Sequence, residues 1–263
     1  MINNNLLIDI ENLSLSIANK TILNSVSIQI YDGDYLSIIG PNGAGKTSLL
    51  KCLMRIYPGY TGRIRFQDKL PDKISQKNLA RLISYVPQAD GRVFPFTVEE
   101  FVMMGRYPHL SPFSSFNSED RNAVNRALEM TRMKPFAPRF MNTLSGGERQ
   151  IVLIAAALAQ GAKIMLLDEP TTFLDPKHEA EIYSILKRLN RELGMTIISV
   201  THDINNAVLQ SDKIVILRQG KIMYWGKAQD VMKNEILERA FDKTFTFVAH
   251  PGTGQNIVVP EVN

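Results

Sequence analysis

A glycine-rich segment early in the chain has the residue types that bind phosphate groups. It reads GPNGAGKTS and matches the pattern G-x-x-x-x-G-K-[ST]. Glycines let backbone N–H groups converge on anionic oxygens, a lysine ammonium reaches the outer phosphates, and a threonine hydroxyl can ligate magnesium. We therefore predict a phosphate-binding loop made of the whole segment: Gly40, Pro41, Asn42, Gly43, Ala44, Gly45, Lys46, Thr47 and Ser48.

Two acidic residues follow an apolar segment later in the chain. Asp168 and Glu169 come directly after KIMLL at 163–167. The carboxyl ends of parallel strands are where doubly wound sheets bind ligands. Beside a phosphate loop, we expect Asp168 to hold magnesium and Glu169 to orient the water that attacks a terminal phosphate. The alternative is that both acids only end a strand and cap the next segment.

A histidine follows a third apolar segment. TIISV at 196–200 is followed by Thr201, His202 and Asp203. His202 is placed to contact a terminal phosphate, and Asp203 suits the cap of the next helix. A lone histidine is more often structural, so this assignment depends on its position at a third strand end.

Two adjacent glycines precede a long apolar run. Residues 144–150 read LSGGERQ and lead into IVLIAAALA. Ser145 and Glu148 have the spacing of a capping box, so a capped helix and nothing more is one interpretation. Adjacent glycines disfavour a helix, but they let backbone amides approach an anion closely. Both roles are open at this point.

The segments that must position these residues alternate between strands and helices. The apolar runs at 35–39, 163–167 and 196–200 lack clean alternation, which is typical of strands buried on both faces of a parallel sheet. A helix is predicted at 176–193, capped by Asp175 and ended by Gly194. Its predicted apolar stripe is Ile182, Ile185, Leu186, Leu189 and Leu193. The pattern predicts an α/β fold with a mostly parallel sheet flanked by helices.

Other segments depart from this alternation. Residues 6–17 and 21–30 predict an antiparallel β subdomain that turns at Asn19-Lys20. Prolines surround a predicted helix near 118–133, which indicates a helical insert. The expected organisation is one large domain at 1–230, with the helical insert at about 89–143, and a C-terminal extension at 231–263.

Composition narrows the class of protein. The 263 residues are 44% hydrophobic, enough for a real core, and Cys52 is the only cysteine, which fits a reducing compartment. The net charge of +4 comes from interspersed charges, so we expect no nucleic-acid partner. The N-terminal residues lack a signal pattern and no apolar run is long enough to cross a bilayer, so we expect neither export nor membrane spanning.

The chain resembles the ATP-binding cassette (ABC) ATPases, a P-loop NTPase family, over about residues 6–227. Six segments carry the resemblance in the family's order: GPNGAGKT at 40–47, YVPQ at 85–88, LSGGE at 144–148, IMLLDEP at 164–170, FLD at 173–175 and THD at 201–203. The resemblance implies ATP hydrolysis with ATP and Mg²⁺ as ligands. The residues that it implies in catalysis are Glu169, His202 and Gln88; those that it implies to hold Mg²⁺ are Thr47, Gln88 and Asp168; and the D-loop is placed around Asp175.

The same resemblance implies a second chain. In this family two cassettes face each other head to tail, and the signature LSGGE of one closes over ATP held by the phosphate loop of the other. This role falls on Leu144, Ser145, Gly146, Gly147 and Glu148. Because the chain has one phosphate loop and one signature, we expect a second copy of itself, or another cassette, as partner. Ile17 departs from the family, in which an aromatic residue usually stacks on adenine there.

The insert resembles a particular group of cassettes. VMMGRYPHL at 102–110 is similar to the ATPases of importers for iron-siderophore complexes, haem and cobalamin. Aromatic residues in loop-like context suggest either a small satellite core or a groove for a short helix of a membrane permease. They are Phe94, Phe96, Tyr107 and Phe113, and Pro108 lies among them.

The resemblance also implies partners and a place in the cell. It implies membrane permease subunits, a substrate-binding protein in the assembled importer, and a peripheral position on the cytoplasmic face of the cell membrane. Importers of zinc or manganese have related segments, and ABC ATPases that act on ribosomes or DNA are a further alternative. A simple P-loop kinase or GTPase would leave LSGGE and Gln88 unexplained.

Overall fold

The computed structural model describes the chain in several stretches and divides it into two compact units. The described residues are 5–67, 69–70, 73–88, 91, 94–111, 114–232, 235–252, 254 and 256–260. The first unit joins residues 1–73 to residues 198–263, and the second is formed by residues 74–197. No helix in these stretches has the length and apolar character needed to cross a membrane.

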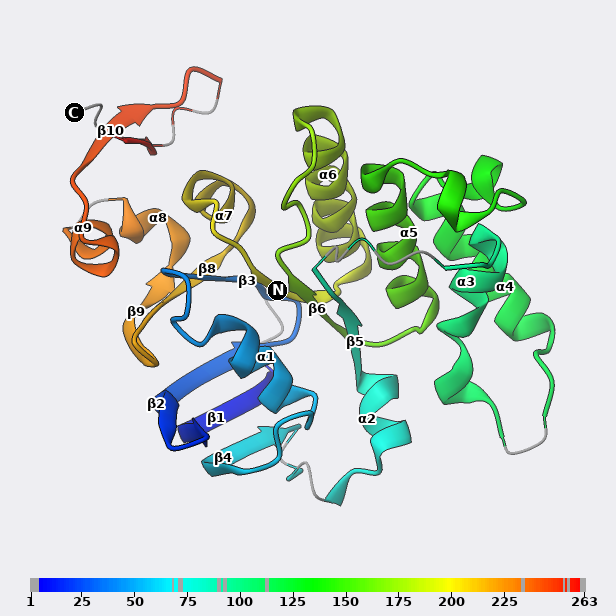
Figure 1. The fold of residues 1–263 in the computed structure, drawn as a ribbon, viewed down its shortest axis with the longest axis horizontal. Helices are drawn as coiled ribbons and strands as arrows, with labels where there is room; N and C mark the ends of the chain where they lie inside the picture. The colour runs from blue at the N-terminus through cyan, green and yellow to red at the C-terminus, as the bar shows by residue number, and fades with distance from the viewer. Residues whose placement is uncertain are drawn as a thin grey trace. The chain divides into compact units, whose positions relative to one another are not determined.

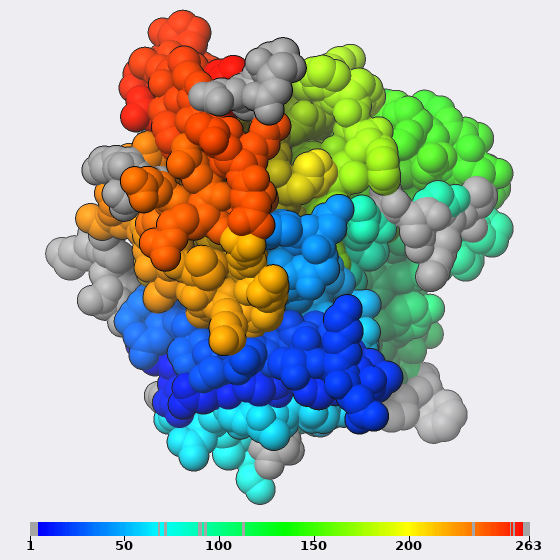
Figure 2. Space-filling model, turned by 60° about the vertical axis from the view of Figure 1, so that its left-hand side comes forward, coloured from blue at the N-terminus to red at the C-terminus, as the bar shows by residue number. Residues whose placement is uncertain are grey.

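An antiparallel sheet opens the first unit. Its strands are β1 (Leu6–Ile17), β2 (Lys20–Tyr31) and β4 (Tyr60–Phe66), in the order β2-β1-β4. The blue surface of β1 and β2 adjoins the cyan surface around β4 in Figure 2. The predicted antiparallel pair is confirmed, but its turn lies at Ala18-Asn19, where φ is 47° and 63°.

Buried strands of the first unit carry the phosphate-binding segment. β3 (Tyr35–Ile39) is buried along its whole length and runs parallel to β8 (Lys213–Arg218), which pairs with antiparallel β9 (Lys221–Lys227). The backbone N–H of Thr201, just after β7 (Thr196–Val200), donates to the carbonyl of Ile38 at 3.1 Å. The carboxyl end of β7 therefore lies beside the carboxyl end of β3.

The C-terminal residues share the core of the first unit. They form two short helices and an antiparallel hairpin. The side chain of Asn205 accepts from the N–H of Val258 at 2.7 Å and donates to its carbonyl at 3.0 Å, and Val258 is buried. The elements are α7 (Ile204–Gln210), α8 (Ala228–Val231), α9 (Ile236–Phe241), β10 (Phe245–Ala249) and β11 (Asn256–Pro260).

The second unit pairs two parallel strands and packs them with helices. β5 (Ile83–Val86) and β6 (Ile164–Asp168) run parallel, as expected for strands buried on both faces. The predicted helix near 118–133 is α4, which ends at Met130. The helices of this unit are α2 (Gln76–Leu82), α3 (Val98–Met104), α4 (Ser118–Met130), α5 (Gly146–Ala159) and α6 (Pro176–Leu193), and α5 and α6 lie side by side (Figure 1).

Helix α6 matches its predicted bounds, but one member of its predicted stripe is wrong. Asp175 caps the helix and Gly194 ends it in the left-handed region at φ 64°. The four earlier stripe residues are buried, whereas Leu193 is 51% exposed. After the turn at Gly194, Met195 and not Leu193 is the buried apolar residue at this helix end, and its N–H donates to the carbonyl of Leu189 at 3.3 Å.

Candidate active site

The phosphate-binding segment folds as a tight loop between β3 and α1 (Lys46–Leu53). Gly40 and Gly45 have φ of 145° and 102°, values that L side chains rarely adopt. A Cβ at Gly40 would lie 2.0 Å from the carbonyl oxygen of Leu217, and one at Gly45 would lie 2.8 Å from that of Ile22. Glycine is therefore required at both positions by space as well as by backbone conformation.

The first turn of α1 is electropositive. Gly45 caps the helix without a side-chain acceptor, and the first turn has no acidic residue, so its N–H groups and helix dipole favour an anion. The ammonium of Lys46 donates to the carbonyls of Gly40 at 2.8 Å and Pro41 at 3.1 Å, which holds it against the loop. Thr47 and Ser48 follow in the same turn, where hydroxyl groups are needed beside a bound phosphate.

The structure places His202 at the same edge of the first unit as the phosphate loop. Thr201 is bonded to Ile38, two residues before the loop begins, and His202 comes next and is exposed. Asp203 caps α7 by accepting from the N–H of Asn206 at 2.9 Å, as predicted. The loop and the histidine are thus brought together within one unit.

In the second unit, Asp168 ends β6 in a buried position. The residue is 4% exposed, and its carboxylate accepts from the phenol of Tyr85 at 3.3 Å. Burial, reinforced by the negative charge of Asp168, holds the pKa of Tyr85 well above its usual range, so the phenol stays neutral and remains a donor. The sequence placed Tyr85 in a motif without giving it a role, and the structure makes it a partner of Asp168.

Glu169 has an unusual backbone and two side-chain partners. Its φ is 48°, in the left-handed region, which is uncommon and costly for a residue with a side chain. Its Oε2 accepts from Nε2 of Gln88 at 3.0 Å and from the hydroxyl of Thr172 at 3.1 Å. The structure therefore joins two predicted catalytic residues, Gln88 and Glu169, and adds Thr172, which the sequence did not single out.

The signature segment forms the predicted capping box at the start of α5. The hydroxyl of Ser145 accepts from the N–H of Glu148 at 3.2 Å, and the Glu148 carboxylate accepts from the N–H of Ser145 at 2.7 Å. The two glycines differ. A Cβ at Gly146 would meet nothing within 4 Å, whereas a Cβ at Gly147 would lie 2.2 Å from Cγ of His178. Glycine is therefore required at position 147 by its packing against His178 of the same chain, a requirement that the sequence alone does not reveal.

Asp175 of the predicted D-loop uses both carboxylate oxygens on the start of α6. Oδ1 accepts from the N–H groups of Lys177 and His178 at 3.0 Å each, and Oδ2 lies 2.6 Å from Nδ1 of His178. The backbone N–H and the imidazole of His178 hold the pKa of this carboxyl below its usual range. A histidine three residues after an N-cap aspartate was the signal in the sequence, but the spacing alone could not reveal its packing.

Ile17 stands at the end of β1, where the resemblance places the residue that stacks on adenine. Its side chain is 40% exposed, so a larger ring can be accommodated there. Because base stacking on an aromatic ring contributes about 1–3 kcal/mol, we expect Ile17→Tyr to lower the Kd for ATP by at least about fivefold in calorimetry. Ile17→Leu is the matched control and should leave the Kd unchanged. Equal affinities for the Tyr variant and the parent would place the base elsewhere.

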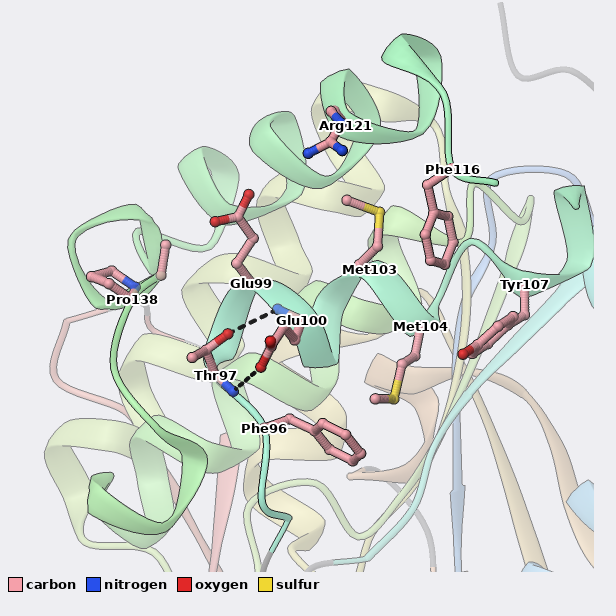
Figure 3. A pocket seen from close by; sticks show the side chains of 11 residues that line it. Phe96, Thr97, Glu99, Glu100, Met103, Met104, Tyr107, Phe116, Arg121 and Pro138 are labelled. Atoms are coloured by element: carbon pink, nitrogen blue, oxygen red, sulfur yellow. Dashed lines mark hydrogen bonds between the residues drawn. The ribbon is translucent and has the colours of Figure 1, made fainter. Parts of the chain in front are cut away.

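A groove of about 610 Å³ opens on the helices of the predicted insert. Figure 3 shows Met104 and Tyr107 at one end and Pro138 at the other, with the capping box of Thr97 and Glu100 between them. Tyr107 is 58% exposed and its ring lies 5.8 Å from that of Phe116. The groove lining is Phe96, Thr97, Glu99, Glu100, Met103, Met104, Tyr107, Phe116, Arg121, Ala137 and Pro138.

Only part of the predicted aromatic cluster lines this groove. Phe96 and Tyr107 do, whereas Phe94 packs against Phe101 with ring centroids 4.9 Å apart. The carbonyl of Pro108 accepts from Arg81 at 2.9 Å. Phe113 lies outside the described residues. Met103 and Met104 also line the groove, and their flexible side chains suit an adaptable surface.

Comparison with known protein families and relatives agrees with these features. Residues 23–172 match the family described as ABC transporter. The Bacillus subtilis "Iron(3+)-hydroxamate import ATP-binding protein FhuC" is 40% identical over 94% of this chain and 92% of its own length. The Escherichia coli "Ferric enterobactin transport ATP-binding protein FepC" is 37% identical over 95% of this chain and 92% of its own length.

Solved structures show the same fold. A metal-chelate type ABC transporter in an inward-facing conformation superposes with a TM-score of 0.85 at 28% identity, covering 98% of both chains. The dimeric structure of MJ0796, a bacterial ABC transporter cassette, gives a TM-score of 0.72 at 29% identity, covering 84% of this chain and 98% of that one. The phosphate loop, the acids after β6, the capped signature helix and these matches together make this chain a member of the ABC transporter ATPase family.

Proposed function

We propose that this chain is the ATP-hydrolysing subunit of an importer for metal chelates, held at the cytoplasmic face of the membrane by permease subunits. The observation that carries the proposal is the set of four sites on one chain: the phosphate loop, the acids after β6, the signature at the start of α5 and the groove over α3. The first two serve nucleotide hydrolysis and the last two serve partners.

The phosphate loop has the features needed for a triphosphate. All three of its glycines have positive φ: Gly40, Gly43 and Gly45. At Gly40 and Gly45 there is also no room for a side chain, so the loop can hold the backbone conformation in which N–H groups converge on an anion. Lys46 supplies the point charge for the outer phosphates.

The donor set fits Mg²⁺. The residues proposed to hold the ion offer a hydroxyl, a carboxylate and an amide oxygen, which are the hard oxygen ligands that Mg²⁺ prefers. Among the described residues no cluster of three or more His, Cys, Asp or Glu forms a protein-only metal site. Mg²⁺ is commonly bound by a few protein side chains together with substrate phosphates. When bound, it would neutralise negative charge that develops on those phosphates. The proposed ligands are Thr47, Gln88 and Asp168.

Glu169 is the proposed general base. Its position after a buried parallel strand and its left-handed backbone fix the carboxylate, and Gln88 and Thr172 restrict it further through hydrogen bonds. A positioned carboxylate can orient a water and accept its proton during attack on the γ-phosphate. His202, at the edge where the phosphate loop begins, is proposed to contact that phosphate.

The proposed active form is a head-to-tail dimer of two copies. Gly146 has an open face, since a Cβ added to it would meet no atom within 4 Å, so no neighbour within the described chain explains its choice. A nucleotide held by a partner chain would explain it, because the N–H groups at the start of α5 then face an anion. Dimeric MJ0796 supports this arrangement, since it shares the fold at 29% identity.

The groove over α3 is the proposed docking site for a cytoplasmic helix of the permease. Its lining combines aromatic and methionine side chains with charged ones, which suits an amphipathic helix. The relatives that support this partner are named as import and transport ATP-binding proteins. In the assembled importer a substrate-binding protein would deliver the chelate to the permease from the other side.

Purification of the tagged chain from its native membranes tests the proposal. We expect a polytopic membrane protein to co-purify, and Tyr107→Arg to reduce its yield at least about tenfold, because charge at the groove disrupts apolar docking. Leu193→Arg is the matched control, since Leu193 is also an exposed apolar residue of the second unit but lies outside the groove. Recovery of ribosomes or DNA instead of a membrane protein would support the non-transport alternative.

The cargo class needs its own experiment. Iron chelates are favoured by the two named relatives, and zinc or manganese remains the alternative. Cells that lack this chain should lose uptake of a radiolabelled ferric siderophore while retaining uptake of zinc and manganese. The opposite pattern would leave the ATPase assignment intact and replace the cargo.

A further inference from the structure

His178 joins two motifs that the sequence places thirty residues apart. Its imidazole packs over the start of α5 and bonds to the residue that caps α6. We propose that His178 is a positioning residue that locks the D-loop to the signature motif, so that both move as one edge when the dimer closes. This inference rests on the proposed function, because it assigns the residue a role in the shared nucleotide site.

The contact with α5 is close. A Cβ at Gly147 would lie 2.2 Å from Cγ, 2.4 Å from Cδ2 and 2.6 Å from Cβ of His178. All three contacted atoms lie close to the backbone of His178. Distances below 3.0 Å to such atoms cannot be relieved by moving only the far end of the side chain. The imidazole therefore fills the space above Gly147, and the His178 side chain is only 20% exposed.

The contact with the D-loop is specific. Nδ1 of His178 lies 2.6 Å from Oδ2 of Asp175, and because a carboxylate only accepts, Nδ1 is the donor in either charge state of the ring. The other oxygen of Asp175 already caps α6. One carboxylate thus fixes both the helix start and the imidazole that rests on α5.

The linked segment presents residues to the outside. Phe173, two residues before Asp175, has φ 66° and is 91% exposed. On the other side of the imidazole, Ser145 and Gly146 form the exposed start of α5. A partner's nucleotide site would contact both segments at once. Because the lock already holds the two segments together, less of their relative motion has to be restricted each time the dimer closes.

The test measures ATP hydrolysis and ATP binding of His178 variants in the full complex. His178→Ala should lower kcat about tenfold and bring the Hill coefficient towards 1, while the Kd for ATP and the melting temperature change little. His178→Asn keeps a donor at the place of Nδ1 and should recover most of kcat. Lys187→Ala, an exposed residue of the same helix, is the control and should match the parent.

A double-mutant cycle checks the packing contact. Gly147→Ala alone should lower the melting temperature and kcat, because its methyl group displaces the imidazole. In the His178→Ala background the ring contacts at 2.2 Å and 2.4 Å are absent and only the Cβ–Cβ contact at 2.6 Å remains, so the same methyl group should cost less than it does in the parent. Independent, additive losses would show that the two residues do not interact.

The outcomes separate this inference from the proposed function. If the parent complex hydrolyses ATP cooperatively and His178→Ala does the same, the lock is wrong and the ATPase assignment stands. If His178→Asn is as impaired as His178→Ala, the hydrogen bond to Asp175 has no positioning role. If the parent complex lacks ATPase activity, the proposed function itself fails.

Discussion

Glu169→Gln is expected to bind ATP normally and to hydrolyse it about 10² to 10⁴ times more slowly than the parent. Glutamine keeps the shape and a hydrogen bond to its neighbours but removes the carboxylate that we propose accepts a proton from water. The bonds from Gln88 and Thr172 show how firmly that carboxylate is placed. Steady-state ATPase activity and nucleotide binding, measured on the same preparation, check the result.

A matched control distinguishes this effect from a general loss of charge. Glu129→Gln makes the same change at an exposed position of α4 and should leave ATPase activity unchanged. The Glu169→Gln dimer should also persist in ATP, because nucleotide bound at the shared site is not consumed. Near-normal turnover in Glu169→Gln would remove Glu169 from the role of general base.

Lys46→Ala is expected to raise the Kd for ATP by roughly 10²-fold. The change deletes the ammonium that Gly40 and Pro41 hold against the loop, and interactions of a charged donor contribute about 1.5–3 kcal/mol each. The glycines set the backbone conformation of the loop, so the chain should still fold, with a modest fall in melting temperature from the lost bonds to Gly40 and Pro41. Calorimetric titration with ATP measures the Kd.

The control for this variant lies on the same helix. Lys51→Ala removes a lysine whose ammonium lies over the ring of Tyr57 at 5.4 Å, away from the loop, and should leave ATP affinity unchanged. Unchanged affinity in Lys46→Ala would mean that the loop is architecture and that phosphates bind elsewhere. Loss of affinity in both variants would point to a general effect of charge.

Local patterns in the sequence predicted much of the fold. The phosphate-loop motif, the Ser145–Glu148 box and the Asp175 cap each depend on neighbours within a few residues, so spacing alone identified them. The strands at 35–39 and 196–200 were predicted from their apolar composition and are confirmed. Such features depend only on residues close to them in the sequence.

Other features depend on contacts that periodicity cannot show. The predicted apolar stripe included Leu193. The pattern located the helix end at Gly194 but did not show which way the chain turns after it. The packing of His178 on Gly147 joins two helices, and neither sequence segment contains a sign of the other. The left-handed backbone of Glu169 is a strained conformation that its surroundings impose. Because glutamate disfavours positive φ, its residue type gives no sign of this conformation.

The measurement that tests the shared nucleotide site most directly is the ATPase activity of Ser145→Arg in the native complex. If the signature closes over a nucleotide held by a second copy, the arginine places bulk and charge in the facing site. Hydrolysis should then fall at least about tenfold, with loss of cooperativity, while each chain still binds ATP. If Ser145 only caps α5, the change weakens the helix by about 1 kcal/mol and the folded protein keeps its activity. Normal, cooperative hydrolysis by Ser145→Arg would contradict the shared site.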